Sequence, residues 1–148
     1  MPDKIRYCCG ALYDTTLNLV VLIRKETPEF QKGYFNLVGG KLEAGETPLD
    51  AMVREFREEA NLTITDWKQF CVFSGSDFEI TYFYSTIDAE KFVDIKSLTQ
   101  EQVVIWSISK GQHTLPLMAN LDWAIPMSLN FARGKSDKVY RVGYDDGV

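Results

Sequence analysis

One segment of the sequence, residues 47–60, carries a complete set of signals for an amphipathic helix. Thr47 suits the N-cap and Pro48 the first helical position, while Asn61 tolerates the left-handed conformation that ends a helix. Apolar side chains recur at helical spacing and form one stripe, which consists of Leu49, Met52, Val53, Phe56 and Ala60. The pattern therefore predicts a helix that packs one face against the rest of the fold.

Short apolar runs alternate with turn signals on both sides of this helix, which is typical of strands. The expected runs are residues 5–13, 17–23, 34–38, 62–73, 78–87 and 103–108. A second helix is expected over residues 115–131, with Pro116 near its start and Pro126 as a point of kinking. Two helices can cover two faces of a sheet, so we expect an α/β sandwich around a mixed sheet. No repeat or linker divides the sequence, which predicts a single domain over residues 1–148.

The charge balance limits the partners that the chain can bind. It has 16 Lys and Arg against 21 Asp and Glu, a net charge of −5 that argues against a nucleic-acid polymer or an anionic membrane surface. A small phosphorylated ligand stays compatible, because a bound divalent cation can reverse the local sign of charge. Cys8, Cys9 and Cys71 are expected to be buried thiols, and the N-terminus lacks an apolar signal core. These features predict a cytoplasmic protein.

Three carboxylates share the outer face of the predicted helix. Glu55, Glu58 and Glu59 lie in one fan opposite the apolar stripe, where like charges repel one another. A divalent cation such as Mg²⁺ or Mn²⁺ would relieve this repulsion, because hard ions prefer oxygen ligands. Arg54 precedes Glu58 by one turn and can orient it. The glutamates alone also fit a solvated acidic face, but the preceding glycine loop favours a phosphate site with metal ligands on the helix.

Residues 40–62 resemble the Nudix box of the Nudix hydrolases, whose pattern is G-x5-E-x7-R-E-U-x-E-E-x-G-U with U an aliphatic residue. The residues that match the pattern are Gly40, Glu46, Arg54, Glu55, Glu58, Glu59 and Leu62. Two positions depart from it: Phe56 replaces an aliphatic residue, and Asn61 replaces a glycine. The resemblance implies a Nudix-type α/β/α sandwich with a central mixed sheet and a MutT-like nucleotide pyrophosphohydrolase.

The resemblance also implies roles for the matching residues. Metal ions would be bound by Glu55, Glu58 and Glu59, with the backbone carbonyl of Gly40 as a further ligand. Arg54 would hold these glutamates in place, and Glu46 and Gly39 would support the loop before the helix. A catalytic base often lies outside the motif in this family, and Glu101 is the candidate here for that base or for another metal ligand. An exposed loop carboxylate is the equal alternative for Glu101.

Substrate-binding residues are expected outside the motif. Arg24 and Lys41 can meet phosphate groups, and the side-chain amides of Asn36 and Asn120 suit the edge of a base. Aromatic rings can stack on that base, the candidates being Phe35, Tyr82 and Trp123. Core packing is the alternative role and is expected for at least half of these rings. The sole histidine, His113, is expected to face solvent.

The leading hypothesis is a nucleoside triphosphate pyrophosphohydrolase, because residues 34–41 are similar in pattern to MutT-like members. An enzyme acting on ADP-ribose, a nucleotide sugar or a dinucleotide is the alternative. A second alternative is a Nudix module that senses a nucleotide without cleaving it, although such modules usually lose the glutamates that this chain keeps. A homodimer is a family-level expectation.

Overall fold

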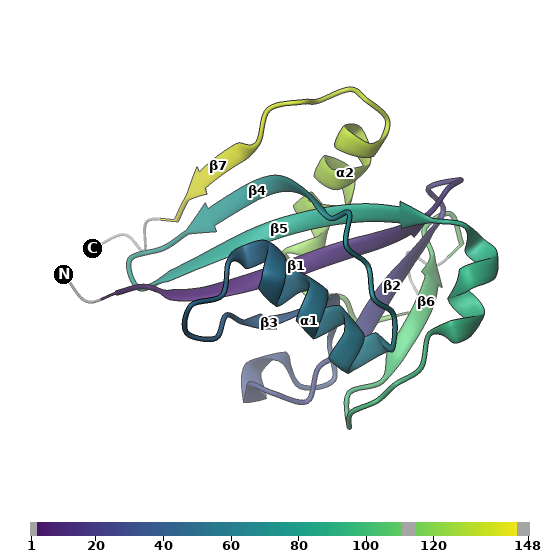
Figure 1. The fold of residues 1–148 in the computed structure, drawn as a ribbon, viewed down its shortest axis with the longest axis horizontal. Coiled ribbons are helices and arrows are strands. Elements are labelled where there is room, and N and C mark those ends of the chain that lie inside the picture. The colour runs from purple at the N-terminus through teal and green to yellow at the C-terminus, as the bar shows by residue number, and fades with distance from the viewer. Residues whose placement is uncertain (1–2, 111–114, 145–148) are drawn as a thin grey trace.

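The computed structural model describes residues 3–110 and 115–144, and its strands form one mixed sheet (Figure 1). The sheet has the order β6-β2-β3-β1-β5-β4-β7. Its strands are β1 (Ile5–Asp14), β2 (Leu19–Arg24), β3 (Phe35–Lys41), β4 (Lys68–Ser74), β5 (Phe78–Ile87), β6 (Val103–Ser107) and β7 (Tyr140–Gly143). The helices are α1 (Pro48–Ala60) and α2 (Leu121–Ala132), with short 3-10 turns η1 (Glu29–Gln31) and η2 (Ala89–Asp94).

The central strand β1 brings the glycine end of β3 to the middle of the sheet. β1 pairs in parallel with β5 along its whole length, from Ile5 opposite Phe78 to Asp14 opposite Ile87. On its other side, the first half of β1 pairs with the end of β3. A Cβ atom added at Gly39 would clash with the backbone carbonyl of Cys8, so this close approach requires a glycine.

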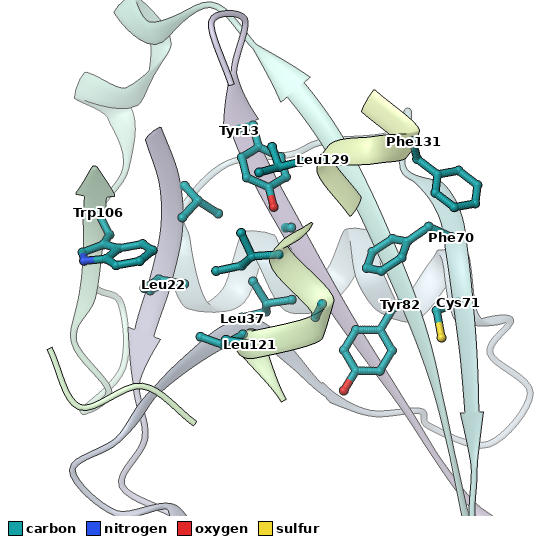
Figure 2. Packing of buried hydrophobic residues seen from close by; sticks show 14 of the residues in the cluster. Tyr13, Leu22, Leu37, Phe70, Cys71, Tyr82, Trp106, Leu121, Leu129 and Phe131 are labelled. Carbon is teal, nitrogen blue, oxygen red and sulfur yellow. The ribbon is translucent and has the colours of Figure 1, made fainter. Parts of the chain in front are cut away.

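The two helices cover opposite faces of the sheet (Figure 1). On one face α1 contributes its predicted stripe, except the exposed Leu49, to a cluster with side chains of β1, β2 and β3, including Leu12, Val21 and Val38. On the other face α2 packs on the cluster shown in Figure 2, whose labelled members include Tyr13, Leu22, Leu37, Phe70, Tyr82, Leu129 and Phe131. The mixed sheet between helices confirms the predicted α/β class.

The glutamate helix has the ends that its sequence predicted. The amide of Asp50 donates to the Thr47 hydroxyl over 3.1 Å, which is the expected N-cap bond. At the other end Asn61 adopts the left-handed conformation with φ of 70°. Both signals lie within a few residues of the helix ends, so the local sequence is sufficient to determine where the helix begins and ends.

Three elements differ from the sequence prediction. The second helix begins at Leu121 rather than at residue 115, because the backbone before it pairs with β3: Phe35 N donates to Pro116 O over 2.8 Å and Met118 N donates to Phe35 O over 2.9 Å. Residues 62–67 are not strand, and β4 starts at Lys68. The strand β7 was not predicted. His113 lies outside the described residues.

In the part of the chain that the structure describes, neither α1 nor α2 has the length and apolar character needed to cross a bilayer.

Candidate active site

The guanidinium group of Arg54 connects the loop before α1 with the carboxylates on the helix. Its Nε and Nη2 atoms donate to the two oxygens of Glu46 over 2.7 and 2.8 Å, a bidentate pairing that fixes both side chains. Its Nη1 atom donates to Glu55 Oε1 over 3.0 Å and to Glu58 Oε2 over 3.1 Å. Nη2 also reaches the carbonyl oxygen of Lys41 over 3.2 Å. The hydrogen bonds from Arg54 lower the pKa of Glu46 to about 2, so this carboxylate is a permanent anchor at neutral pH.

The side chain of Glu55 extends from α1 to the end of β3, where a glycine leaves room for its carboxylate. A Cβ atom added at Gly40 would clash with the carboxylate group of Glu55. Burial raises the pKa of Glu55, the hydrogen bond from Arg54 opposes this shift, and the nearby charges of Glu58 and Glu59 raise the pKa further. Because these charges disfavour one another, a divalent cation among them would lower the electrostatic energy of the whole group.

Glu59 lies one turn further along α1 and contacts a different part of the chain. Thr99 Oγ1 donates to Glu59 Oε2 over 2.9 Å, and the backbone N–H of Glu101 donates to the same hydroxyl over 3.1 Å. The Glu101 carboxylate accepts from Lys25 Nζ over 3.1 Å and from the backbone N–H of Glu26 over 2.6 Å. Burial raises the pKa of Glu59, the Thr99 bond lowers it, and the Glu101 charge raises it. Glu101 is therefore a partly buried neighbour of Glu59 rather than an exposed loop carboxylate.

The carboxylates on α1 suit a hard divalent ion, although their oxygens face protein partners here. Within residues 3–110 and 115–144, no three His, Cys, Asp or Glu side chains are grouped closely enough to hold a metal ion. In this arrangement Arg54 Nη1 donates to Glu55 and Glu58, and Thr99 donates to one oxygen of Glu59. The oxygens of Glu55, Glu58 and Glu59 are the kind of donor that a hard divalent ion prefers, so these residues would hold it.

A second group of candidate residues meets where α2 begins, on the opposite face of the sheet. Asn120 Nδ2 donates to Asn36 Oδ1 over 3.1 Å and to the Tyr82 hydroxyl over 3.3 Å. The Trp123 ring packs edge-on against Tyr82 with centroids 5.0 Å apart, and it stacks on Phe73 at 5.6 Å. The Oδ1 atom of Asn120 is buried and has no hydrogen-bond partner among the described residues. A buried acceptor without a partner costs about 1–3 kcal/mol relative to one that is hydrogen-bonded.

The remaining candidates are placed apart from this second group. Phe35 is a core side chain of the α2 face with 6% of its surface exposed, so the structure supports core packing rather than an open stacking surface for its ring. Arg24 is exposed, pairs with Glu26 over 3.3 Å, and lies opposite Phe35 at the start of β3. Lys41 is exposed at the other end of β3. The two cations thus lie near opposite ends of β3 instead of forming one patch.

Sequence reasoning did not identify Thr99, Lys25 or Phe73. Thr99 and Lys25 reach the site from segments far from α1 in the sequence, and their hydrogen bonds depend on tertiary structure. The available signal for Thr99 was its position two residues before the candidate Glu101 in a polar run. Phe73 is an ordinary strand residue in the sequence, and nothing there distinguishes it from the other aromatic side chains.

Comparisons with known proteins agree with this geometry. A family model described as the NUDIX domain matches residues 5–109. A MutT structure from work on Aliivibrio salmonicida and Vibrio cholerae is 22% identical, with a TM-score of 0.69, covering 84% of this chain and 95% of that one. MutT from Bacillus halodurans is also 22% identical, with a TM-score of 0.68 and coverage of 96% and 91%. The NUDIX domain of Shewanella oneidensis NrtR, complexed with ADP ribose, is 12% identical, with a TM-score of 0.74 and coverage of 88% and 90%. No curated protein matches the sequence.

The family model covers well over half of the chain, and the chain therefore belongs to the NUDIX domain family. The likeness to the solved structures confirms the predicted Nudix-type fold. With Glu55, Glu58 and Glu59 of the motif in place on α1, the chain is a Nudix hydrolase.

Proposed function

We propose that this chain hydrolyses a ribo- or deoxyribonucleoside triphosphate to the nucleoside monophosphate and pyrophosphate by attack of water on phosphorus. Mg²⁺ is the proposed cofactor, with Mn²⁺ able to replace it. The observation that carries the proposal is the row of Glu55, Glu58 and Glu59, held by Arg54 beside Gly40 at the end of β3. We further propose that residues 1–148 act as a single domain on this small-molecule substrate in the cytoplasm, as a homodimer.

Different residues of this chain have different proposed roles at the phosphate end of the site. Glu55, Glu58 and Glu59 would hold the ions, and the Gly40 carbonyl would add a further oxygen. When bound, a divalent ion stabilises the charge on phosphate oxygens and lowers the pKa of a water molecule. Arg54 keeps the row of carboxylates in place through its hydrogen bonds.

Anchoring and charge come from the residues around this row. Glu46 fixes the far side of the Arg54 guanidinium. The close approach of Gly39 to β1 holds the loop that begins at the end of β3. Lys41 and Arg24 supply positive charge near the two ends of β3.

Glu101 is the proposed base or further ligand, and its surroundings define what that role requires. Both of its oxygens accept hydrogen bonds, one from Lys25 and one from the backbone of Glu26. To take a proton from water, one oxygen has to exchange a protein donor for the water molecule. The oxygen bonded to Lys25 is the one that can make this exchange, because a lysine side chain can rotate away while a backbone N–H cannot. Glu101→Gln should therefore lower kcat without changing the affinity for nucleotide.

The nucleoside end of the substrate is proposed to lie at Asn120. The unpartnered Oδ1 of Asn120 can accept from a donor on a base edge, and Asn36 is its neighbour. The partly buried Trp123 ring packs beside these amides against Tyr82, which is a core side chain only 2% exposed, so Trp123 is the ring that supports stacking of a base. This combination of a hydrogen-bonding edge and rings favours a purine or pyrimidine nucleotide over a phosphate compound that lacks a base.

ADP-ribose is the second candidate substrate, and one observation favours it. The NUDIX domain of Shewanella oneidensis NrtR, which was crystallised with ADP ribose, has a TM-score of 0.74 to this chain. Nucleotide sugars and dinucleotides share the same diphosphate chemistry. A nucleotide-sensing role without hydrolysis is the remaining alternative, and the complete set of motif glutamates argues against it.

A substrate panel tests the proposal directly. Purified protein in Mg²⁺ is given ribo- and deoxyribonucleoside triphosphates, oxidised deoxyribonucleoside triphosphates, ADP-ribose, nucleotide sugars and dinucleotides. We expect pyrophosphate and a monophosphate from at least one triphosphate, at a higher kcat/KM than for any other compound. A preference for ADP-ribose over every triphosphate would replace the proposed substrate, and no turnover of any compound would favour the sensing role.

A further inference from the structure

The last turn of α1 is capped by a distant loop rather than by solvent. We call residues 94–101 the capping loop. The backbone N–H of Lys96 donates to the carbonyl of Ala60 over 3.2 Å, and that of Leu98 donates to the carbonyl of Glu59 over 3.4 Å. Carbonyls of a final helical turn have no partner within the helix, so the capping loop satisfies groups that would otherwise need water.

Asn61 attaches the start of this loop to the helix. Its Nδ2 donates to the carbonyl of Asp94 over 3.0 Å, while its own backbone is in the left-handed conformation at φ of 70°. The Nudix pattern has glycine at this position. Glycine and asparagine both adopt a positive φ, but only asparagine carries an amide that can donate to another segment. Asn61, which replaces the glycine of the pattern, therefore adds a hydrogen bond between the end of α1 and the capping loop.

The end of the capping loop reaches the row of carboxylates. Thr99 donates to Glu59 Oε2 and accepts from the backbone N–H of Glu101, so one hydroxyl ties a motif glutamate to the candidate base. Of the residues that the structure describes, Thr99 is the one that hydrogen-bonds the Glu59 carboxylate. It uses one carboxylate oxygen and leaves the other for a ligand. Lys25 and the backbone of Glu26, just after β2, then fix Glu101.

We propose that Asn61 and Thr99 are positioning residues for Glu59: Asn61 fixes the capping loop to the end of α1, and Thr99 orients the Glu59 carboxylate toward the metal site. The proposal rests on the proposed function only in taking Glu59 as a metal ligand. It does not depend on which nucleotide is the substrate. Because Asn61 holds the start of the capping loop and Thr99 lies near its end, loss of either contact should disturb the same carboxylate.

Four variants test this assignment. Asn61→Gly restores the residue of the Nudix pattern and keeps the backbone conformation, so it removes only the amide bond. Thr99→Val removes the hydroxyl at nearly constant volume, and Thr99→Ser restores it. Thr63→Val is the matched control, because Thr63 is an exposed threonine just after Asn61. Mn²⁺ binding to each protein is measured by electron paramagnetic resonance without substrate, and kcat and KM are measured separately.

We expect Asn61→Gly and Thr99→Val each to weaken Mn²⁺ binding by about tenfold, the low end of the effect of residues that orient metal ligands. The kcat should fall by a similar factor with KM within about twofold, since the nucleoside contacts are untouched. Thr99→Ser should restore both values. Hydrogen exchange of the Lys96 and Leu98 amides should speed up by about tenfold in Asn61→Gly, as expected for a loop that has lost one hydrogen bond.

Unchanged Mn²⁺ affinity in both Asn61→Gly and Thr99→Val would overturn the proposal, as would failure of Thr99→Ser to restore binding. Absence of Mn²⁺ binding by the unmodified protein would overturn it too, because Glu59 would then not be a ligand. A protein that binds Mn²⁺ but hydrolyses no triphosphate would refute the proposed function alone. In that case the binding and exchange data still decide the role of Asn61 and Thr99.

Discussion

The two faces of the sheet bury similar apolar clusters but present different chemistry at their edges. On the α1 face the polar groups are charged, and one arginine hydrogen-bonds three carboxylates. On the α2 face they are neutral amides and a phenol among aromatic rings, with a buried amide oxygen left without a partner. The difference teaches that this chain separates the groups suited to phosphate and metal from the groups suited to a base.

If this division is correct, changes on the α1 face should alter turnover, and changes on the α2 face should alter affinity. The strongest test is Glu58→Gln, which removes a charge from the row at constant shape. We expect kcat to fall by more than about 100-fold, beyond the 10–100-fold typical of residues that only orient ligands. The KM should stay within about threefold in steady-state assays of the best substrate. Glu90→Gln on η2 is the control, and a Glu58→Gln protein with full activity would disprove the role of the row.

Gly40→Ala tests whether the gap beside Glu55 matters. The added methyl group would clash with the Glu55 carboxylate and push it away from the row. Mn²⁺ affinity should fall by about tenfold or more, while circular dichroism stays native. Gly143→Ala on β7 provides the comparison, since a Cβ atom there meets nothing within 4 Å. Equal metal affinity in the two alanine variants would mean that Glu55 is not placed by this gap.

Asn120→Ala examines the other face of the sheet. Removing the amide should raise KM by about tenfold, which corresponds to the loss of one hydrogen bond of about 1.4 kcal/mol. The kcat should stay within about threefold of the unmodified value. Asn130→Ala is a matched change on the exposed side of the same helix. The comparison between the faces would fail if Asn120→Ala lowered kcat as strongly as Glu58→Gln.

The smallest effects are expected at the cysteines, which belong to neither site. Burial raises the pKa of Cys8 and Cys9 from 9.0 to about 12 and that of Cys71 to about 11. At pH 8 the folded protein should react with a thiol reagent at least about 100-fold more slowly than the unfolded chain, because so little thiolate is present. The stability that these protonated thiols contribute is present below pH 9.0 and is lost as the pH rises toward about 12. Labelling of the native protein at pH 8 as fast as that of the unfolded chain would contradict the expected low reactivity of these thiols.

The sequence predicted those parts of the fold and site whose causes are local. The ends of α1 depend on Thr47 and Asn61, which act within a few residues of themselves. The row of glutamates and its arginine follow from helical spacing, so their proximity was readable from the sequence. The sequence named Asn36 and Asn120 as candidates for the edge of a base, and their side chains lie 3.1 Å apart, although this contact itself was not predicted.

The parts that the sequence did not predict depend on distant partners. The helical pattern over residues 115–131 gives no sign that Pro116 and Met118 pair with the backbone of β3. This pairing prevents a helix from forming before Leu121. β7 exists as a strand because it pairs with β4, about 70 residues earlier, and its own sequence has no strong alternation. The same reason applies to Thr99, since its role follows from a hydrogen bond to a helix forty residues away.

The parallel pairing of β1 with β5 has a consequence for how the chain reaches this fold. Each pair, from Ile5 with Phe78 to Asp14 with Ile87, joins residues 73 positions apart, so closing the centre of the sheet requires a long loop. Contacts of such separation slow folding. During synthesis, the glutamate helix leaves the ribosome before β5 exists. The centre of the sheet can therefore close only after residue 87 has emerged, and the capping loop joins α1 later still.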